Sequence, residues 1–301
     1  NLLERAILLK DLRLRGCKTF FVHYSYWSLF ILKAISLFLP MRIFYWHAEE
    51  LKPEDLAKMK NLERKLLTSA VRTAPILVTA GERLKAAYAD TFNVDEGKIR
   101  ILPNWVEEVS QEKNIGKLRD RLGLPTDKTI VLFVHHLSRR KGAHLLPAIV
   151  DEVTEQMQDS YFVIIGSGPL GKSLKSKLRG RRAAVLGDVP QQRIMDYYQA
   201  ADIFIMPSLR EGFPRVILEA MAAGLPIVTT DVGEVTSVVP EEQQQYIIKP
   251  FLTQQFSQAI VELINSSEKR TQVAEANRTQ VKVYNFNRAE AALNKLFDER
   301  I

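Results

Sequence analysis

Short apolar runs alternate with longer amphipathic segments along most of the 301-residue chain. The runs at 76–80, 129–134 and 202–206 lack polar alternation, which is typical of strands buried on both faces. Strands that alternate with helical patterns predict parallel sheets with helices on both faces, and therefore an α/β fold. We expect strands at residues 18–23, 41–46, 76–80, 98–102, 129–134, 161–165, 183–186, 202–206, 226–229 and 245–248.

The intervening segments carry apolar residues at helical spacing. We expect helices at residues 2–14, 24–39, 53–70, 82–92, 142–157, 170–178, 191–200 and 213–223, and further helices from residue 253 onward. The final helix is expected to begin at Asn287, which forms a capping-box-like pair with Glu290. The polar segment 107–127 is interpreted as a linker, so the chain divides into two series of elements and is long enough for two cores.

The most apolar stretch, residues 19–39, is about as long as the roughly 20 residues that a membrane-spanning helix needs. His23, Lys33 and Pro40 interrupt it, together with several tyrosines and serines. A buried helix, or a helix resting at a membrane interface, is therefore the favoured interpretation.

Composition narrows the classes of partner and compartment. The net charge of +7 favours anionic partners such as nucleotides, nucleic acid or an acidic membrane surface. Cys17 is the single cysteine, which excludes an intramolecular disulfide and a cysteine metal cluster and makes a reducing, cytoplasmic compartment the expectation. Charged residues in the first ten positions do not match a signal peptide.

The chemistry is expected to centre on residues 207–224, which read PSLREGFPRVILEAMAAG. Glu219 has only apolar neighbours in a predicted helix, so its carboxylate needs a partner or a ligand, unless it is simply an exposed helical glutamate. Glu211 lies in the preceding loop, and the backbone amides of Gly212 and Phe213 lie at a helix N-terminus that favours anions. An anion site between two carboxylates suits a ligand with phosphates and hydroxyls, such as a sugar nucleotide.

Several motifs occur in an order that resembles a known enzyme family. They are Gly-Ser-Gly-Pro at 166–169, Leu-Gly-Asp-Val at 186–189, Glu-Gly-Phe-Pro at 211–214 and Glu-Ala-Met-Ala-Ala-Gly-Leu-Pro at 219–226. Pro-Asn-Trp-Val-Glu at 103–107 is similar to the Pro-Asn-Gly-Val-Asp that the family carries at its domain junction. Over roughly residues 19 to 290 the chain resembles retaining nucleotide-sugar glycosyltransferases of family 4, which have the GT-B fold of two Rossmann-like domains.

The resemblance implies roles for individual residues. Glu219 matches the glutamate that binds ribose hydroxyls, and Glu211 matches the one that faces the transferred sugar. The backbone of 212–214 would hold the diphosphate and the sugar, while Lys141 would neutralise the charge that builds on the leaving diphosphate. His47 matches a histidine near the donor sugar, with an ordinary strand-end histidine as the alternative. The other residues that the resemblance assigns to donor binding are Gly212, Phe213, Pro214, His136, Arg140, Gly166, Gly168 and Val189.

The chain departs from the family pattern in three ways, one of which is Gly81 at a position where a serine or threonine often caps the helix. His136 stands five residues before Lys141, where the family has an arginine, and Arg139 or Arg140 is left to supply the missing charge. The first strand and glycine-rich loop of the family's first domain have no counterpart before residue 18. The first domain is therefore expected to be shortened, and a partner subunit that completes it is one interpretation.

The basic run 172–182 holds six cations in eleven residues. A solvated helix face is the plain interpretation, and contact with an anionic membrane is the sharper one, because related enzymes act on lipid-linked acceptors. Nucleic-acid binding is not expected, since the aromatic residues lie in apolar runs and not beside the cations.

The sequence thus predicts an N-terminal acceptor-side domain at 1–110, a donor-binding domain at 111–284 and a terminal helix, 285–301, that returns to the first domain. The expected activity is transfer of a hexosyl group from a nucleotide diphosphate sugar to a hydroxyl acceptor, lipid-linked or a glycan, with retention. No metal or other cofactor is expected, because GT-B enzymes work without a metal and the chain has no Asp-X-Asp pair. The alternative is a binding or scaffold subunit with weakened catalysis.

Overall fold

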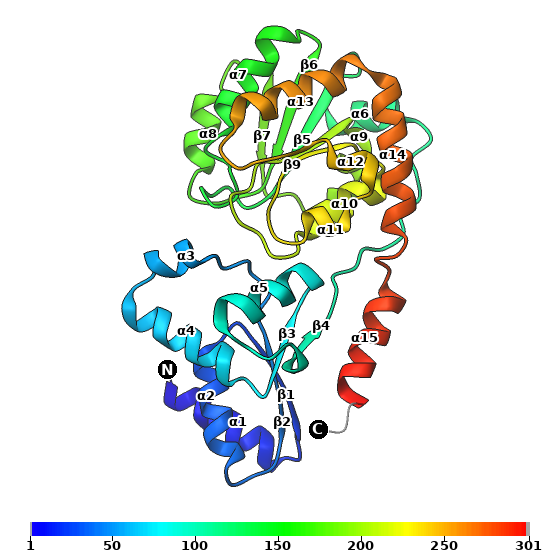
Figure 1. Ribbon diagram of the computed structural model, residues 1–301. Coiled ribbons are helices and arrows are strands. Elements are labelled where there is room, and N and C mark those ends of the chain that lie inside the picture. Colours follow the sequence, from blue (N-terminus) through cyan, green and yellow to red (C-terminus); the bar gives the residue numbers. More distant parts are fainter. Residues whose placement is uncertain (1, 299–301) are drawn as a thin grey trace. The chain divides into compact units, whose positions relative to one another are not determined.

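The computed structural model describes residues 2–298 and divides into two compact units (Figure 1). Unit 1 comprises residues 2–104 and 289–298, and unit 2 comprises residues 105–288. The observed boundaries lie six residues before the predicted 110/111 and four residues after the predicted 284/285.

Unit 1 is built on a parallel four-stranded sheet in the order β1-β2-β3-β4. Leu29 and Leu32 of the helix after β1 are fully buried against this sheet, with Tyr45 and Leu77 in the same core. The strands are β1 (Thr19–His23), β2 (Arg42–Trp46), β3 (Ile76–Thr79) and β4 (Ile99–Ile101). The helices are α1 (Leu2–Leu14), α2 (Tyr26–Ser36), α3 (Pro53–Lys58), α4 (Asn61–Thr73), α5 (Glu82–Phe92) and the short 3-10 helix η1 (Glu96–Lys98).

The last helix, α15 (Phe286–Asp298), packs on the unit 1 sheet through its C-terminal half. The Arg42 guanidinium donates to the carbonyl of Phe297, and the rings of Phe44 and Phe297 meet edge-on with centroids 5.5 Å apart. Residues near the chain's end therefore help to cover a strand that lies more than 250 positions earlier, since Arg42 and Phe297 are 255 residues apart.

Unit 2 is a parallel six-stranded sheet in the order β10-β9-β8-β5-β6-β7. Its two faces carry separate cores: Ile130 and Leu132 of β5 point into one, and Val131 and Phe133 point into the other. This alternation explains why β5 reads as an unbroken apolar run. The strands are β5 (Thr129–Val134), β6 (Ser160–Ile165), β7 (Ala183–Gly187), β8 (Ile203–Met206), β9 (Ile227–Thr230) and β10 (Ile247–Ile248).

Helices cover both faces of this second sheet (Figure 1). They are α6 (Ile115–Leu122), α7 (Leu146–Gln156), α8 (Gly171–Lys177), α9 (Gln191–Ala200), α10 (Arg215–Ala223), α11 (Val235–Val238), α12 (Glu241–Gln244), α13 (Thr253–Asn265) and α14 (Ser267–Val281). The α/β class and the two parallel sheets predicted from the sequence are confirmed.

One expectation about the first unit was wrong in detail. The segment expected as one helix at 53–70 is split into α3 and α4, because Met59 and Lys60 adopt extended backbone angles. Leu56 and Met59 pack against the core, whereas Leu62 is 68% exposed. The apolar stretch 19–39 forms the strand and the helix expected at 18–23 and 24–39, as β1 and α2, with Ser25 accepting a hydrogen bond from the Ser28 amide at the helix start.

The second unit corrects three further expectations. Segment 107–127 is not only a linker, because Asn114 caps α6 and Leu118 is buried. Helix α7 begins at Leu146 and not at residue 142, since Gly142 has a φ of +72° that a right-handed helix excludes. The final helix begins at Phe286, where the Asn285 side chain, and not that of Asn287, accepts from the Arg288 amide.

Candidate functional site

The candidate site lies where the strand order of unit 2 reverses direction. From β5 the chain moves outward through β6 and β7, and it then returns to place β8 on the other side of β5. In open α/β sheets, ligands bind outside the carboxyl ends of the strands at such a switch point. His135 directly follows β5, and Ser208 lies two residues beyond the end of β8.

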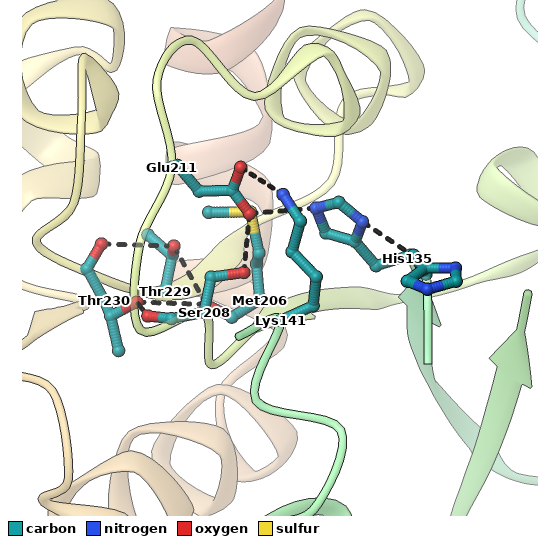
Figure 2. A network of polar contacts seen from close by, with 8 residues as sticks. His135, Lys141, Met206, Ser208, Glu211, Thr229 and Thr230 are labelled. Atoms are coloured by element: carbon teal, nitrogen blue, oxygen red, sulfur yellow. Dashed lines mark hydrogen bonds and ion pairs between the residues drawn. The ribbon is translucent and has the colours of Figure 1, made fainter. Parts of the chain in front are cut away.

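Glu211 is the centre of a buried polar cluster at this point (Figure 2). Its Oε2 lies 2.5 Å from Nζ of Lys141, which reaches it from the turn before α7. Its Oε1 accepts from Oγ of Ser208 at 2.8 Å and lies 2.9 Å from Nε2 of His135. Residues far apart in the sequence thus meet on one carboxylate.

The cluster holds Glu211 in its ionised form. Burial alone would raise the pKa of this carboxyl, but the hydrogen bond from His135, and then the charge and hydrogen bond of Lys141, outweigh it and lower the pKa to about 2. A carboxylate in this state is a hydrogen-bond acceptor and an ion-pair partner at neutral pH, and not a proton donor.

Glycine permits the close approach of the turn that carries Lys141. A Cβ on Gly142 would lie 1.9 Å from the carbonyl oxygen of Pro207, so the turn and the segment after β8 touch backbone to backbone. The Leu209 amide donates to the carbonyl of Arg140 at 2.9 Å and joins the same two segments. The position of Lys141 beside Glu211 therefore depends on a residue without a side chain at 142.

The residues between β8 and α10 form a backbone turn against a second loop. The Glu234 amide donates to the carbonyl of Gly212 at 2.8 Å, and a Cβ on Gly233 would lie 2.0 Å from the same oxygen. Pro214 is the N-cap of α10, and its side chain makes no cap hydrogen bond. The N-terminal end of a helix carries backbone amides and a positive dipole end, which favours an anion.

Glu219 lies inside α10 and has the partner that its apolar setting demands. Its Oε2 accepts from Oη of Tyr198 on α9 at 2.9 Å. Tyr198 is fully buried, and its pKa is raised well above the ordinary value by burial and then by the charge of Glu219. Glu219 is only half-buried, so part of its carboxylate remains accessible to a ligand.

The other donor-side candidates are distributed around the same strand ends. His136 and Arg140 are exposed. Gly166 and Gly168 follow β6, and a Cβ on either would collide with backbone oxygens, those of His135 and Leu137 respectively. Val189 follows β7 and packs, half-buried, against the core that contains α9 and α10.

His47 belongs to unit 1, where it directly follows β2 and is buried. Its Nδ1 contacts the hydroxyl of Tyr88, which donates to the carbonyl of Glu49 at 2.9 Å. Burial, and then the charge of His23, lower the pKa of His47 to about 4, so the imidazole is neutral at physiological pH. The Tyr88 contact satisfies Nδ1 of His47 within unit 1, which fits both interpretations of this histidine.

Sequence reasoning assigned no role to His135, Ser208 or Tyr198. The available signal was position: His135 and Ser208 lie just beyond the carboxyl ends of two apolar runs, where parallel sheets bind ligands. Tyr198 lies 21 residues before Glu219, and no local pattern connects the two.

The described part of the chain contains no group of three or more His, Cys, Asp or Glu side chains arranged to hold a metal ion. Among residues 2–298, no helix has the length and apolar character needed to cross a bilayer.

Comparison with known proteins places the chain among glycosyltransferases. Residues 114–280 match the family described as "Glycosyl transferases group 1". The chain is 32% identical over 212 residues to the "Putative teichuronic acid biosynthesis glycosyltransferase TuaC" of Bacillus subtilis (strain 168), covering 70% of this chain and 52% of that protein. It is 29% identical over 191 residues to the "Phosphatidylinositol N-acetylglucosaminyltransferase GPI3 subunit" of Saccharomyces cerevisiae (strain RM11-1a), covering 60% of this chain and 41% of that protein.

Solved structures support the fold. Anabaena Alr3699/HepE in complex with UDP-glucose superposes with a TM-score of 0.82 at 17% identity, covering 98% of this chain and 82% of that one. At this identity the likeness concerns the fold, which is the GT-B fold expected from the sequence motifs. The chain spans about half the length of the curated relatives, 52% for TuaC and 41% for the GPI3 subunit.

Proposed function

Because the chain belongs to the glycosyl transferases group 1 family, we propose that it transfers a hexosyl group from a nucleotide diphosphate sugar to a hydroxyl acceptor, with retention of configuration. The observation that carries this proposal is the buried cluster of Lys141, Glu211 and His135 at the switch point of unit 2. It sets an ammonium group beside the N-terminal end of α10, and a leaving diphosphate requires such positive potential.

Each donor contact has a candidate group in unit 2. Glu219 offers a half-buried carboxylate to ribose hydroxyls, and Lys141 with the first amides of α10 offers positive potential to the diphosphate. The relative Alr3699/HepE was solved with UDP-glucose, a ligand of this class. The proposed reaction uses no metal, since the lysine and the helix end supply the charge stabilisation.

The proposed acceptor is a hydroxyl on a lipid-linked molecule or a glycan. His47 is the candidate contact from unit 1, because a neutral imidazole with Nδ1 engaged by Tyr88 presents Nε2 to a sugar hydroxyl. Peripheral contact with an anionic membrane is part of the proposal. Lys172, Lys175 and Arg179 line an open groove of about 510 Å³ beside the edge strand β7 and carry the required charge.

The donor is identified by thermal shift with UDP-, GDP- and ADP-sugars, because a ligand that binds only the folded state raises the melting temperature. Hydrolysis of the stabilising donor, measured without acceptor, then tests the chemistry.

We expect Lys141→Met to lower turnover far more than it raises the donor KM, since the ammonium acts on charge that develops in the transition state. Lys128→Met is the control, because Lys128 pairs with Asp159 outside the site. Normal turnover in Lys141→Met would assign the role to Arg139 or Arg140 instead.

The second candidate function is a nucleotide-sugar-binding subunit with weakened catalysis, which a partner would complete. His136 in place of an arginine favours it, because histidine lacks the permanent charge and the bidentate donor geometry of a guanidinium. The GPI3 relative is itself named as a subunit. A chain that is stabilised by a nucleotide sugar but neither hydrolyses nor transfers it would support this alternative.

A further inference from the structure

His135 occupies a position that the surrounding backbone determines closely. Its amide donates to the carbonyl of Ile165 at 3.1 Å, which continues the pairing of β5 with β6 past the strand ends. A Cβ on Gly166 would lie 2.0 Å from the carbonyl oxygen of His135, so the two segments are in direct contact. The backbone of His135 is therefore held by the sheet, which fixes the point from which its ring extends.

The hydrogen bonds of His135 define its tautomer. The His136 amide donates to Nδ1 of His135 at 2.9 Å, which requires a lone pair on Nδ1. In the neutral ring the proton is consequently on Nε2, and Nε2–H donates to Oε1 of Glu211 at 2.9 Å. The ring needs no positive charge to make both contacts.

Two donors therefore occupy one oxygen of Glu211, and the other oxygen faces the lysine. Oε1 receives His135 and Ser208, and Oε2 receives Lys141, as Figure 2 shows. A carboxylate fixed at one oxygen cannot rotate freely, so its second oxygen has a defined direction. The direction of Oε2 in turn sets the position of the Lys141 ammonium group that pairs with it.

We propose that His135 is a positioning residue, whose Nε2–H orients the Glu211 carboxylate so that Oε2 fixes the Lys141 ammonium at the donor site. This inference rests on the proposed function, because the placement matters only if Lys141 stabilises a leaving diphosphate. It predicts an effect on turnover that a purely structural histidine would not have.

The test replaces His135 by residues that differ in whether they carry a side-chain donor and in where that donor lies. Glutamine places its amide nitrogen near the position of Nε2, whereas asparagine places it near Nδ1, and leucine has no donor. We expect His135→Leu and His135→Asn to lower the kcat of donor hydrolysis about 10–100-fold, with little change in donor KM. His135→Gln should recover most of the loss. Equal turnover in the Gln, Asn and Leu variants would overturn the inference.

A double-mutant cycle separates action through Lys141 from a direct contact with substrate. In the Lys141→Met background the effect of His135→Leu should vanish, because no ammonium remains to be placed. An undiminished effect in that background would also overturn the inference. His144→Gln, on the same turn as Lys141, is the control for histidine replacement and should behave as wild type.

A measurement without turnover keeps this inference distinct from the proposed function. If the wild-type chain neither hydrolyses nor transfers the sugar of any donor that stabilises it, the proposed function fails by itself. ¹⁵N NMR of histidine-labelled protein then decides the inference: the neutral His135 ring must carry its proton on Nε2, and that proton must shift in Glu211→Gln. A proton on Nδ1 would refute the placement.

Discussion

At the scale of single residues, Glu211 is a buried carboxylate whose partners lower its pKa. A buried carboxylate is costly unless it is paired, and Glu211 is paired by an ammonium, a hydroxyl and an imidazole. The contacts that hold these side chains together therefore also stabilise the buried negative charge of Glu211.

This arrangement makes part of the stability depend on pH. A carboxyl whose folded pKa of about 2 lies below its ordinary 4.5 stabilises the folded state above that ordinary value, and the stabilisation is lost as the pH falls toward 2. We expect about 3 kcal/mol of acid-dependent stability in the wild type to be missing in Glu211→Gln. Chemical denaturation at stepped pH measures the difference, with the exposed Glu241→Gln as control. Parallel curves for wild type and Glu211→Gln would contradict the pairing.

Glu219 offers a separate test of nucleotide binding. Glutamine at this position can still accept from Tyr198, so Glu219→Gln should fold while losing the charge that ribose hydroxyls contact. We expect nucleotide affinity to fall by about 1.5–3 kcal/mol, or about 10–150-fold, which calorimetry measures. Tyr198→Phe, which keeps the carboxylate, should lose less. A folded Glu219→Gln variant with unchanged affinity would rule out the ribose contact.

At the scale of elements, the turn between β5 and α7 depends on backbone shape. Gly142 and Gly180 have similar positive φ values, +72° and +76°, but a Cβ on Gly180 would meet nothing within 4 Å. We expect Gly180→Ala to cost about 1 kcal/mol from strain alone. Gly142→Ala should cost more and should also lower turnover, because the clash with Pro207 displaces Lys141. Thermal melts with donor-hydrolysis assays measure both, and equal behaviour of the two variants would show that the close approach is unimportant.

The elements that sequence predicted best are those set by local pattern. Strand 129–134 and helices 82–92 and 191–200 have the predicted ends, because apolar spacing marks each of them. The charged helix α6 was missed, since Leu118 and the buried Arg119, which pairs with Asp202, were hidden among surface charges. The split between α3 and α4 was missed because no glycine or proline marks it.

The candidate site was predictable only in part, because its contacts join residues on elements that are far apart in the sequence. Glu219 was expected to need a partner, and the sequence could not name Tyr198 because the contact joins two helices. Glu211 and Lys141 were proposed for separate roles on the donor, and the structure adds that they form an ion pair. His135 was assigned no role, because its partner lies 76 residues away.

At the scale of the whole molecule, the excess of positive charge leads to a test of membrane contact. Within the run 172–182, Arg181 pairs with Asp151 and Arg182 donates to the carbonyl of Thr154, so these two cations have structural roles. The groove cations Lys172, Lys175 and Arg179 remain the candidates for lipid contact. Each cation near an anionic surface contributes about 1 kcal/mol, and salt screens that gain.

We expect co-sedimentation with liposomes to require anionic lipid, to weaken with salt, and to fall when Lys172, Lys175 and Arg179 are changed together to glutamate. The control changes Lys113, Lys117 and Lys282, which are exposed in the same unit, so that net charge alters equally. Equal losses for both triple variants would mean that overall charge and not this groove binds the lipid. No binding under any condition would leave the run as a solvated helix face.

The path of the chain through its two units has a practical consequence for handling the protein. The chain passes from unit 1 to unit 2 near residue 104 and returns near residue 288, so unit 1 is assembled from two separate lengths of sequence. A protease cut at the first passage would leave α15 on the larger fragment, with its ring and carbonyl contacts to Phe44 and Arg42 still available. The nicked halves are therefore expected to copurify until a denaturant is added. Expressing residues 2–104 alone would produce a sheet that has lost one of its covering helices.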